Sequence, residues 1–281
     1  MTGSPPRVWV GGDLVDPHAP SISALDHAVT VGDAVFETAK IDRGRPFALS
    51  RHHARLERSA AGLGLPPVDL TVIAKGIDAV LAGEPIDFGR LRYSVTGGVG
   101  PLGSDRGGAN LTYIVLAAPQ PRPPVSGRLT VVPWTRNERS AVAGLKTTSY
   151  AENVVALARA KEVGATEAVF GNTRGELCEC TGSNIFVVVD GEVLTPHVDS
   201  GLLPGITREL VLEWASDAGV PIREVSLPLD VLATADEVFI TSSTKDVLPI
   251  HAVDGRDLPV GPVTAGLRDL FRERAEQDLD P

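Results

Sequence analysis

The sequence predicts an α/β protein of the α+β type, made of two domains. Its 281 residues are more than a single hydrophobic core usually supports. Segments with the alternating pattern of strands and segments with the apolar spacing of helices follow one another along the chain. A proline-rich run at residues 119–124 separates the two halves, because proline fixes φ and lacks the N–H donor that a helix or a central strand needs.

The domain division follows from this run. We expect a smaller N-terminal α+β domain over residues 1–118, a stiff linker over residues 119–126, and a larger C-terminal α/β domain over residues 127–281. Because ligands often bind between domains, residues on both sides of the linker are expected to contribute to one site.

The N-terminal domain is expected to combine a sheet with helices. Strands are predicted at residues 7–10, 47–49, 91–96 and 110–117, and helices at residues 51–63 and 71–81. A glycine-rich turn separates the last two strands.

The C-terminal domain is expected to contain six strands and two helices. The strands are predicted at residues 129–133, 167–170, 176–180, 185–189, 193–195 and 237–241, and the helices at residues 149–161 and 207–218. Ser149 and Glu152 have the spacing of a capping box that opens the first helix. Asp190 and Gly191 predict a hairpin turn.

Charge and composition exclude several classes of protein. The formal net charge is −10, and the 26 Lys and Arg residues are scattered, so no basic surface for nucleic acid is expected. The aliphatic stretches are too short to span a bilayer, and the first residues do not resemble a signal peptide. We expect a cytoplasmic protein that binds neither nucleic acid nor membrane.

The two cysteines predict no metal site and no disulfide framework. Cys178 and Cys180 are separated by one residue, and no other Cys or His cluster completes a set of four ligands. We expect both to be small apolar residues of a strand.

A lysine lies just before the first predicted helix of the C-terminal domain, in the segment Gly144 to Tyr150. Most lysines are solvated surface charges, and that role stays open for Lys146 taken alone. An amine that is held by ordered backbone is nevertheless what Schiff-base chemistry requires.

An acidic residue, Glu179, lies between the two cysteines in a predicted strand. Because successive side chains of a strand alternate, Glu179 is expected to point away from both thiols. It is either an exposed acid or a carboxylate that can hold a protonated pyridine nitrogen.

Two further segments could bind a phosphate. Pro204 and Gly205 turn directly into a predicted helix, where the amides of Ile206 and Thr207 and the helix dipole favour an anion. A second segment, Ser242 to Thr244, ends a strand with three hydroxyl groups. Each segment alone is also consistent with an ordinary helix start or turn.

Taken together, these residues resemble the fold-type IV pyridoxal-phosphate (PLP) enzymes, which are the class IV aminotransferase family. That family comprises branched-chain and D-amino acid aminotransferases and 4-amino-4-deoxychorismate lyases. The resemblance covers nearly the whole chain, and the matching segments occur in the family's order: residues 32–38, 52–56, 144–146, 179–186, 203–207 and 242–244.

The resemblance implies the fold, the cofactor and the residues that bind it. The fold would be D-amino acid aminotransferase-like, with a C-terminal pseudo-barrel, and the protein a homodimer. Lys146 would be the Schiff-base lysine, and Glu179 would pair with the pyridine nitrogen. The phosphate would be held by Arg55, Ile206, Thr207, Ser243 and Thr244.

Other residues are implied more indirectly. Tyr150 would lie near the cofactor, or would only pack at the helix start. Phe36 and Glu37 match a region that lines the substrate side in relatives. Arg92 and Arg106 are expected to bind substrate carboxylates, although either could be a surface ion-pair partner.

The resemblance favours the lyase, which forms 4-aminobenzoate and pyruvate in folate biosynthesis. D-amino acid aminotransferases have an arginine where this chain has Gly97, and branched-chain enzymes tend to have a proline where it has Tyr93. Residues 146–154 and 100–106 look most like lyase sequences. The alternatives are an amino acid transaminase and a non-catalytic protein that binds a phosphate ligand.

Overall fold

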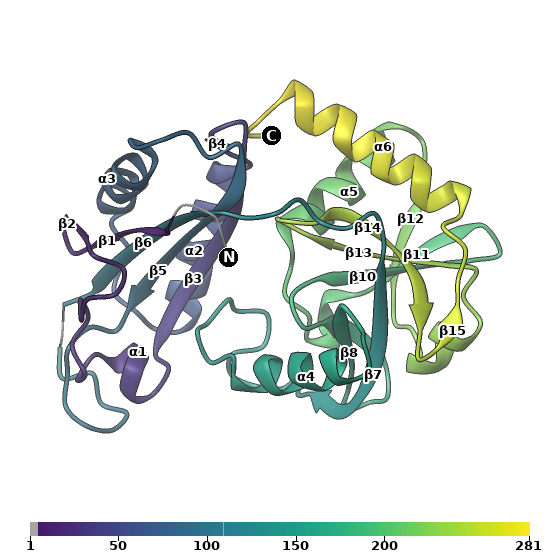
Figure 1. Ribbon diagram of the computed structural model, residues 1–281. Coiled ribbons are helices and arrows are strands. Elements are labelled where there is room, and N and C mark those ends of the chain that lie inside the picture. Colours follow the sequence, from purple (N-terminus) through teal and green to yellow (C-terminus); the bar gives the residue numbers. More distant parts are fainter. Residues whose placement is uncertain (1–4, 109) are drawn as a thin grey trace. The chain divides into compact units, whose positions relative to one another are not determined.

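The computed structural model describes residues 5–108 and 110–281 (Figure 1). They form two compact units. The first comprises the described residues up to Arg122, together with Leu145–Ser149 and Leu279–Pro281. The second comprises Pro123–Gly144 and Tyr150–Asp278. The first change of unit lies inside the expected linker, but the two short segments assigned to the first unit lie within the expected C-terminal domain.

The first unit is built on an antiparallel sheet with the strand order β2-β1-β6-β5-β3-β4. The strands are β1 (Arg7–Val10), β2 (Asp13–Val15), β3 (Ala34–Asp42), β4 (Arg45–Pro46), β5 (Phe88–Thr96) and β6 (Thr112–Pro119). Its helices are the short α1 (His27–Thr30), α2 (Leu49–Gly62) and α3 (Leu70–Leu81).

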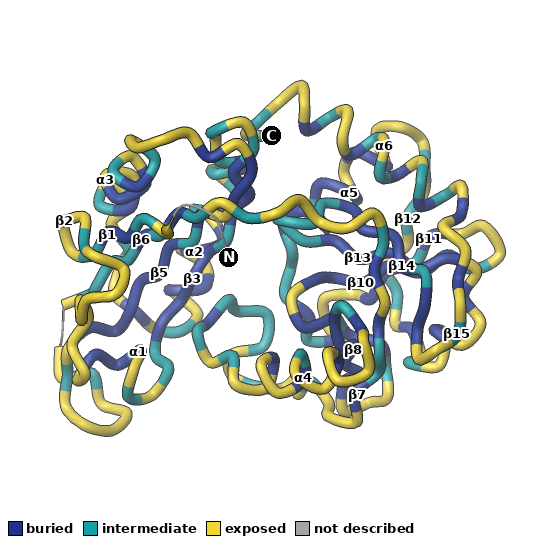
Figure 2. The backbone as a smooth tube through the Cα atoms, viewed as in Figure 1, coloured by how far each residue is buried: buried dark blue, intermediate teal, exposed yellow. Residues whose placement is uncertain are grey.

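Helices α2 and α3 pack on one face of this sheet. Leu56 of α2 and Ile77 of α3 share a buried core with Val35 and Tyr93 of the strands, and Figure 2 shows buried residues along β3 and β5. Gly76 allows α3 to approach closely, because a Cβ atom there would lie 2.6 Å from the side chain of Val115. The opposite face of β3 is therefore free of these helices.

The N-terminus of α2 is completed by a distant segment. Its N-cap residue, Ala48, offers no side-chain acceptor. Instead, Asp280 accepts a hydrogen bond from Ser50 N at 2.8 Å, and Leu279 O accepts one from Ala48 N at 2.7 Å. These contacts explain why Leu279–Pro281 belongs to the first unit.

The second unit contains a mixed nine-stranded sheet with the order β12-β11-β10-β13-β14-β7-β8-β9, and β15 pairs with β14. The strands are β7 (Gly127–Arg136), β8 (Glu167–Asn172), β9 (Leu177–Cys180), β10 (Asn184–Val189), β11 (Glu192–Pro196), β12 (Ile222–Val225), β13 (Glu237–Ser242), β14 (Asp246–Val253) and β15 (Arg256–Asp257). Although β9 ends the hydrogen-bonded path, it lies against β10, so the sheet curls around its core.

Three helices and two 3-10 turns complete this unit. Helix α4 (Ala151–Glu162) packs on β7 and β8, while α5 (Ile206–Asp217) and α6 (Pro262–Gln277) pack on each other and on β13. The 3-10 turns are η1 (Val198–Ser200) and η2 (Leu229–Ala233). The α/β class predicted from the sequence is confirmed. Within the described residues, no helix combines the length and the apolar character needed to cross a membrane.

Two local predictions were wrong. Residues 47–49 are not a strand, because the strand ends at Pro46 and Leu49 already begins α2. Ser149 does not cap a helix: α4 starts at Ala151 after Tyr150, and Ser149 Oγ donates to Gly32 O at 3.2 Å. Glu152, the other half of the expected capping box, instead pairs with Arg136 at 2.6 Å.

Glu237 at the start of β13 supports the N-terminus of α6. Its carboxylate accepts hydrogen bonds from Thr264 N at 2.7 Å and Val263 N at 3.2 Å, although Gly261, the N-cap residue, has no side chain. We expect Glu237→Ala to lower the free energy of unfolding by about 1–2 kcal/mol, as loss of a helix cap does. Urea unfolding would measure this effect, with Glu273→Ala on the exposed face of α6 as the control. Equal stability of the two variants would contradict the capping role.

Candidate active site

Lys146 lies in the first unit, where its backbone is held on two sides. Phe36 N donates to Lys146 O at 3.0 Å, and Thr148 N donates to Ala34 O at 2.8 Å. Lys146 N donates to Ser59 Oγ of α2 at 3.1 Å. The segment thus runs antiparallel beside the start of β3. The backbone of Lys146 is held in place although it lies outside any helix or strand.

The Lys146 ammonium lies over an aromatic ring. Its Nζ is 4.5 Å from the centroid of the Phe36 ring, and the guanidinium of Arg92 on β5 is 3.7 Å from the same centroid. Val35 faces the helices, so Phe36 points to the opposite face of β3. The structure therefore brings together three of the predicted residues, Lys146, Phe36 and Arg92, on the sheet face that α2 and α3 do not cover.

Behind this face lies a buried charge cluster. Glu37 is fully buried on the helix side of β3 and accepts hydrogen bonds from Arg55 Nε at 2.8 Å and Arg55 Nη2 at 2.7 Å. His52 Nδ1 lies 2.6 Å from the same carboxylate. Arg55, which the resemblance assigns to a phosphate, is thus already paired on one edge with Glu37. Its role toward a phosphate stays a prediction.

The pKa values in this cluster follow from burial and pairing. Burial alone would raise the pKa of Glu37, but the Arg55 guanidinium and His52 outweigh burial and hold that pKa well below its ordinary value of 4.5. Burial lowers the pKa of His52, more than the hydrogen bond with Glu37 raises it. The cluster is therefore an ionised Glu37–Arg55 pair with a neutral histidine that donates through Nδ1.

Arg106 lies in a clamp. Nε and Nη2 donate to the two carboxylate oxygens of Asp33, each at 2.6 Å. Nη1 donates to Gly64 O at 2.6 Å, and Nη2 also donates to Leu63 O at 2.9 Å. All three guanidinium nitrogens of Arg106 are thus engaged by protein groups, and its role toward a substrate carboxylate stays a prediction.

Glu179 belongs to the second unit, on β9. Cys178 and Cys180 on either side are buried, whereas Glu179 is half-buried, as the strand alternation predicts. Its Oε2 accepts a hydrogen bond from Leu203 N at 3.0 Å, and its Oε1 lies 3.4 Å from Arg136 Nε. The carboxylate is therefore oriented from two sides.

The start of α5 has the properties of an anion seat. Its N-cap residue, Gly205, provides no side-chain hydrogen bond to the first turn, which Ile206 and Thr207 begin. A side chain at residue 205 would displace the Asn184 amide, because a Cβ atom there would lie 2.0 Å from Asn184 Oδ1. Asn184 also donates to Leu203 O at 2.8 Å, so one amide fixes the turn that leads into the helix.

The end of β13, which packs against α5, carries the predicted hydroxyl groups. Thr241 Oγ1 and Ser242 Oγ are buried and have no hydrogen-bond partner within the described part of the chain. Ser243 and Thr244 follow in a turn and are half-buried. Buried hydroxyl groups without partners are costly unless a ligand or water satisfies them, so this strand end suits a polar ligand such as a phosphate.

Tyr150, which was predicted to lie near the cofactor, is the half-buried N-cap residue of α4.

The residues that hold the predicted groups in place were not predicted from the sequence. Ser59, Asn184 and Arg136 support the backbone or carboxylate of other residues, and only Asn184 lies inside a segment that the resemblance had marked. No group of His, Cys, Asp and Glu suited to a metal ion occurs among the residues that the structure describes.

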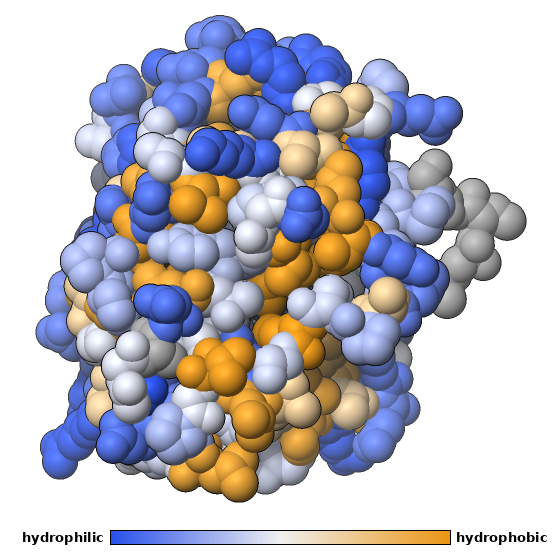
Figure 3. All heavy atoms as spheres, turned by 90° about the vertical axis from the view of Figure 1, so that its left-hand side faces the viewer, coloured by the Kyte–Doolittle hydropathy of each residue, from blue (hydrophilic) through white to orange (hydrophobic). Residues whose placement is uncertain are grey.

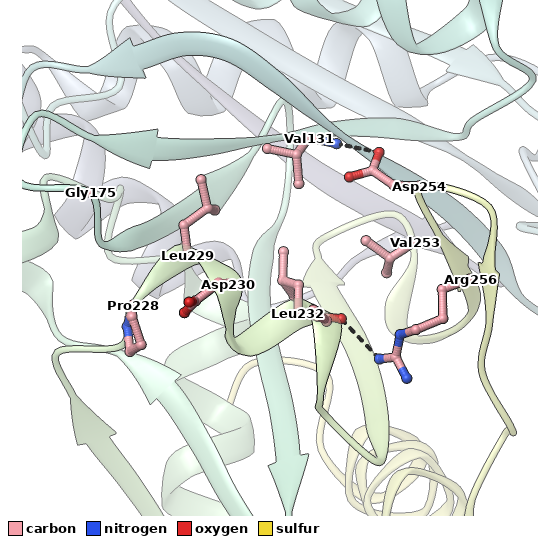
Figure 4. Close-up of a pocket in the computed structure, with 10 residues that line it drawn as sticks. Val131, Gly175, Pro228, Leu229, Asp230, Leu232, Val253, Asp254 and Arg256 are labelled. Carbon is pink, nitrogen blue, oxygen red and sulfur yellow. Dashed lines mark hydrogen bonds between the residues drawn. The ribbon is translucent and has the colours of Figure 1, made fainter.

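A cavity of about 610 Å³ lies elsewhere in the second unit (Figure 4). Val131, Leu229 and Leu232 form apolar walls, and Arg256 Nη2 donates to Leu232 O at 2.9 Å. None of the described residues predicted to bind cofactor or substrate lines it.

Comparison with known proteins identifies the family. The model of the class IV amino-transferases matches residues 34–253, which includes both Lys146 and Glu179. The chain belongs to this family. It is therefore an enzyme, and pyridoxal phosphate is its cofactor.

Individual relatives cover almost the whole chain. A putative branched-chain-amino-acid aminotransferase of Methanocaldococcus jannaschii is 33% identical, with 95% of this chain and 96% of the relative aligned. The PLP-bound form of a hypothetical aminotransferase from Mycobacterium tuberculosis is 26% identical, with a TM-score of 0.85 and coverage of 95% and 97%. The 4-amino-4-deoxychorismate lyase of Pseudomonas aeruginosa is 29% identical, with a TM-score of 0.83 and coverage of 98% and 100%. Relatives of this chain thus include both an aminotransferase and a lyase.

The Glu37 cluster makes stability depend on pH. Because the pKa of Glu37 is lower in the folded than in the unfolded chain, its contribution is present above pH 4.5 and is lost as the pH falls. We expect Glu37→Gln to lower the free energy of unfolding by about 3 kcal/mol at about pH 7, since it leaves Arg55 buried without its ion pair. The difference from the wild type should shrink on acidification in urea unfolding. Glu57→Gln, on the exposed side of α2, is the control, and a difference independent of pH would refute the assignment.

Proposed function

We propose that this enzyme is an aminodeoxychorismate lyase, which converts 4-amino-4-deoxychorismate to 4-aminobenzoate and pyruvate in folate biosynthesis. The observation that carries the proposal is the conformation around Gly97. A Cβ atom at this position would lie 2.3 Å from Asp33 Oδ2, and Arg106 holds Asp33 in place. A side chain at this position, such as the arginine of D-amino acid aminotransferases, would therefore displace Asp33 from its pairing with Arg106.

The described residues fit the cofactor. Lys146 would attach it covalently, Glu179 would hold its ring nitrogen, and Tyr150 would lie near it. The phosphate would take the amides of Ile206 and Thr207 at the uncapped start of α5, the side chains of Ser243 and Thr244, and Arg55. When bound, pyridoxal phosphate withdraws electrons from the substrate carbon that bears the amine.

The remaining steps are assigned to this chain's own groups. Lys146 Nζ would move the proton at the carbon bearing the substrate amine, because its backbone is fixed and its side chain alone needs to reposition. Arg92 would bind a substrate carboxylate, since its guanidinium lies over Phe36 on the same sheet face as Lys146. Glu37 would act indirectly, by fixing Arg55.

Transamination of a branched-chain amino acid is the alternative, and the 33% identity to the Methanocaldococcus jannaschii relative favours it. Against it stands Tyr93, which is fully buried against His53 where branched-chain enzymes tend to have proline.

We also propose that the enzyme is a cytoplasmic homodimer. Apolar side chains reach the surface of the first unit on the face shown in Figure 3. Leu25, Val29, Val31, Val99 and Leu102 are exposed large apolar residues of this unit, and the pairing of Asp26 with Val99 brings two of their segments together. Exposed apolar groups of this kind support a contact with a second copy.

The reaction can be tested without an amino acceptor. We expect PLP-loaded protein to form 4-aminobenzoate and pyruvate in equal amounts from 4-amino-4-deoxychorismate alone, and Lys146→Ala to form neither. A transaminase would instead need a keto acid and would release no pyruvate from this substrate. Borohydride should fix the cofactor to the wild type and not to Lys146→Ala. Amino transfer from leucine to a keto acid, without the two products, would replace the proposal by its alternative.

Arg92 has its own test. We expect Arg92→Gln to raise KM for the substrate by at least about tenfold, the loss of one charge-assisted hydrogen-bonding group, without changing the affinity for pyridoxal phosphate. Arg90→Gln, an exposed arginine two residues away on β5, should leave both quantities unchanged. Steady-state kinetics and cofactor titration measure them, and an unaltered KM in Arg92→Gln would remove the role.

A further inference from the structure

A single buried carboxylate, Glu167, gathers donors from two turns of the second unit. It begins β8 and is 3% exposed. Its Oε2 accepts from Thr181 Oγ1 at 3.0 Å and from Gly182 N at 2.7 Å. Its Oε1 accepts from Ser183 Oγ at 2.5 Å and pairs with the ammonium of Lys245. No sequence pattern had drawn attention to either Glu167 or Lys245.

Both turns adjoin the groups assigned to the cofactor. Residues 181–183 directly follow β9, which carries Glu179. Lys245 directly follows Ser243 and Thr244, and its N–H donates to Ser242 O at 3.1 Å. Because Asn184 pairs with Thr241 across β10 and β13, the two turns lie at the same end of neighbouring strands. Glu167 therefore links the strand end of Glu179 to the turn that carries the hydroxyl groups.

Burying a carboxylate is a costly way to join two turns. Desolvation of the Glu167 carboxylate offsets much of its attraction to the half-buried Lys245. What the ion pair adds is a defined geometry, because the carboxylate fixes four donors at once. Burial would raise the pKa of Glu167, but Lys245, the Ser183 hydroxyl and the Gly182 N–H more than offset it, so the group is ionised in the folded protein.

We propose that Glu167 and Lys245 are a positioning pair that holds the Ser243–Thr244 turn in the conformation that receives the cofactor phosphate. Neither residue touches the cofactor in this proposal. The proposal rests on the proposed phosphate site. It says that part of the affinity for pyridoxal phosphate comes from two residues that contact the phosphate-binding turn and not the phosphate itself.

The test compares two ligands that differ only in the phosphate. We expect Lys245→Met to weaken the binding of pyridoxal 5′-phosphate to the apoenzyme by about tenfold. In metal sites, removal of a residue that hydrogen-bonds to a ligand weakens binding by at least about this factor. Binding of pyridoxal, which lacks the phosphate, should not change. Lys245→Arg should restore most of the affinity, and Lys161→Met, at an exposed position on α4, should bind both ligands as the wild type does. Absorbance titration of apoenzyme reports all four results.

Two outcomes overturn the proposal, and they can be told apart from a failure of the cofactor site. Equal weakening of both ligands, or no weakening of either, means that the pair does not position the phosphate turn. If the wild type itself binds the two ligands equally, the phosphate site is wrong. Should Lys245→Met fail to fold because Glu167 is left unpaired, the double variant Glu167→Gln/Lys245→Met removes both charges and gives the same comparison.

Discussion

Two main-chain hydrogen bonds join residues 146–148 to the start of β3, and much of the proposed chemistry depends on them. They place a segment from the middle of the sequence within the first unit, although the residues on either side of it belong to the second. The lysine is thus anchored through its backbone, and its ammonium lies over the Phe36 ring. Ser59 strengthens the arrangement, because its hydroxyl accepts from Lys146 N and ties the segment to α2.

Within each unit, buried or half-buried carboxylates hold other groups of the proposed site in place. In the first unit, Glu37 fixes Arg55 from within the helix-covered face, and Asp33 fixes Arg106 in its clamp. In the second unit, Arg136 and Leu203 N fix Glu179, and Glu167 gathers two turns. In each case a carboxylate holds donors that sequence places far apart. Side chains that need a fixed position in the proposed site are therefore held by hydrogen bonds or ion pairs to a second group.

Local patterns predicted the parts of the fold that depend on local order. The strand at residues 7–10, the helix predicted over residues 71–81 and the hairpin at Asp190 and Gly191 all follow from apolar spacing and turn residues. The structure confirms them, with the helix at Leu70–Leu81. The pairs Glu37–Arg55, Asp33–Arg106 and Glu167–Lys245 could not be predicted, since 18, 73 and 78 residues separate their partners. The capping prediction at Ser149 failed for the same reason, because Gly32 competes for its hydroxyl from far along the chain. The roles of Lys146 and Glu179 were predicted from the resemblance of several segments taken together. Strand β3 and helix α6 were not predicted, because no local pattern was recognised in their sequences.

The two cysteines lead to a practical consequence. Both are buried in β9, and burial raises the pKa of each thiol, so neither forms the reactive thiolate readily. The wild-type chain is therefore a nearly silent background for thiol labelling. A dye pair attached at cysteines introduced at the exposed positions Lys75 and Lys161, one in each unit, would report the distance between the units through energy transfer. Such a chain could be followed as cofactor and substrate are added, one molecule at a time, without first removing either native cysteine.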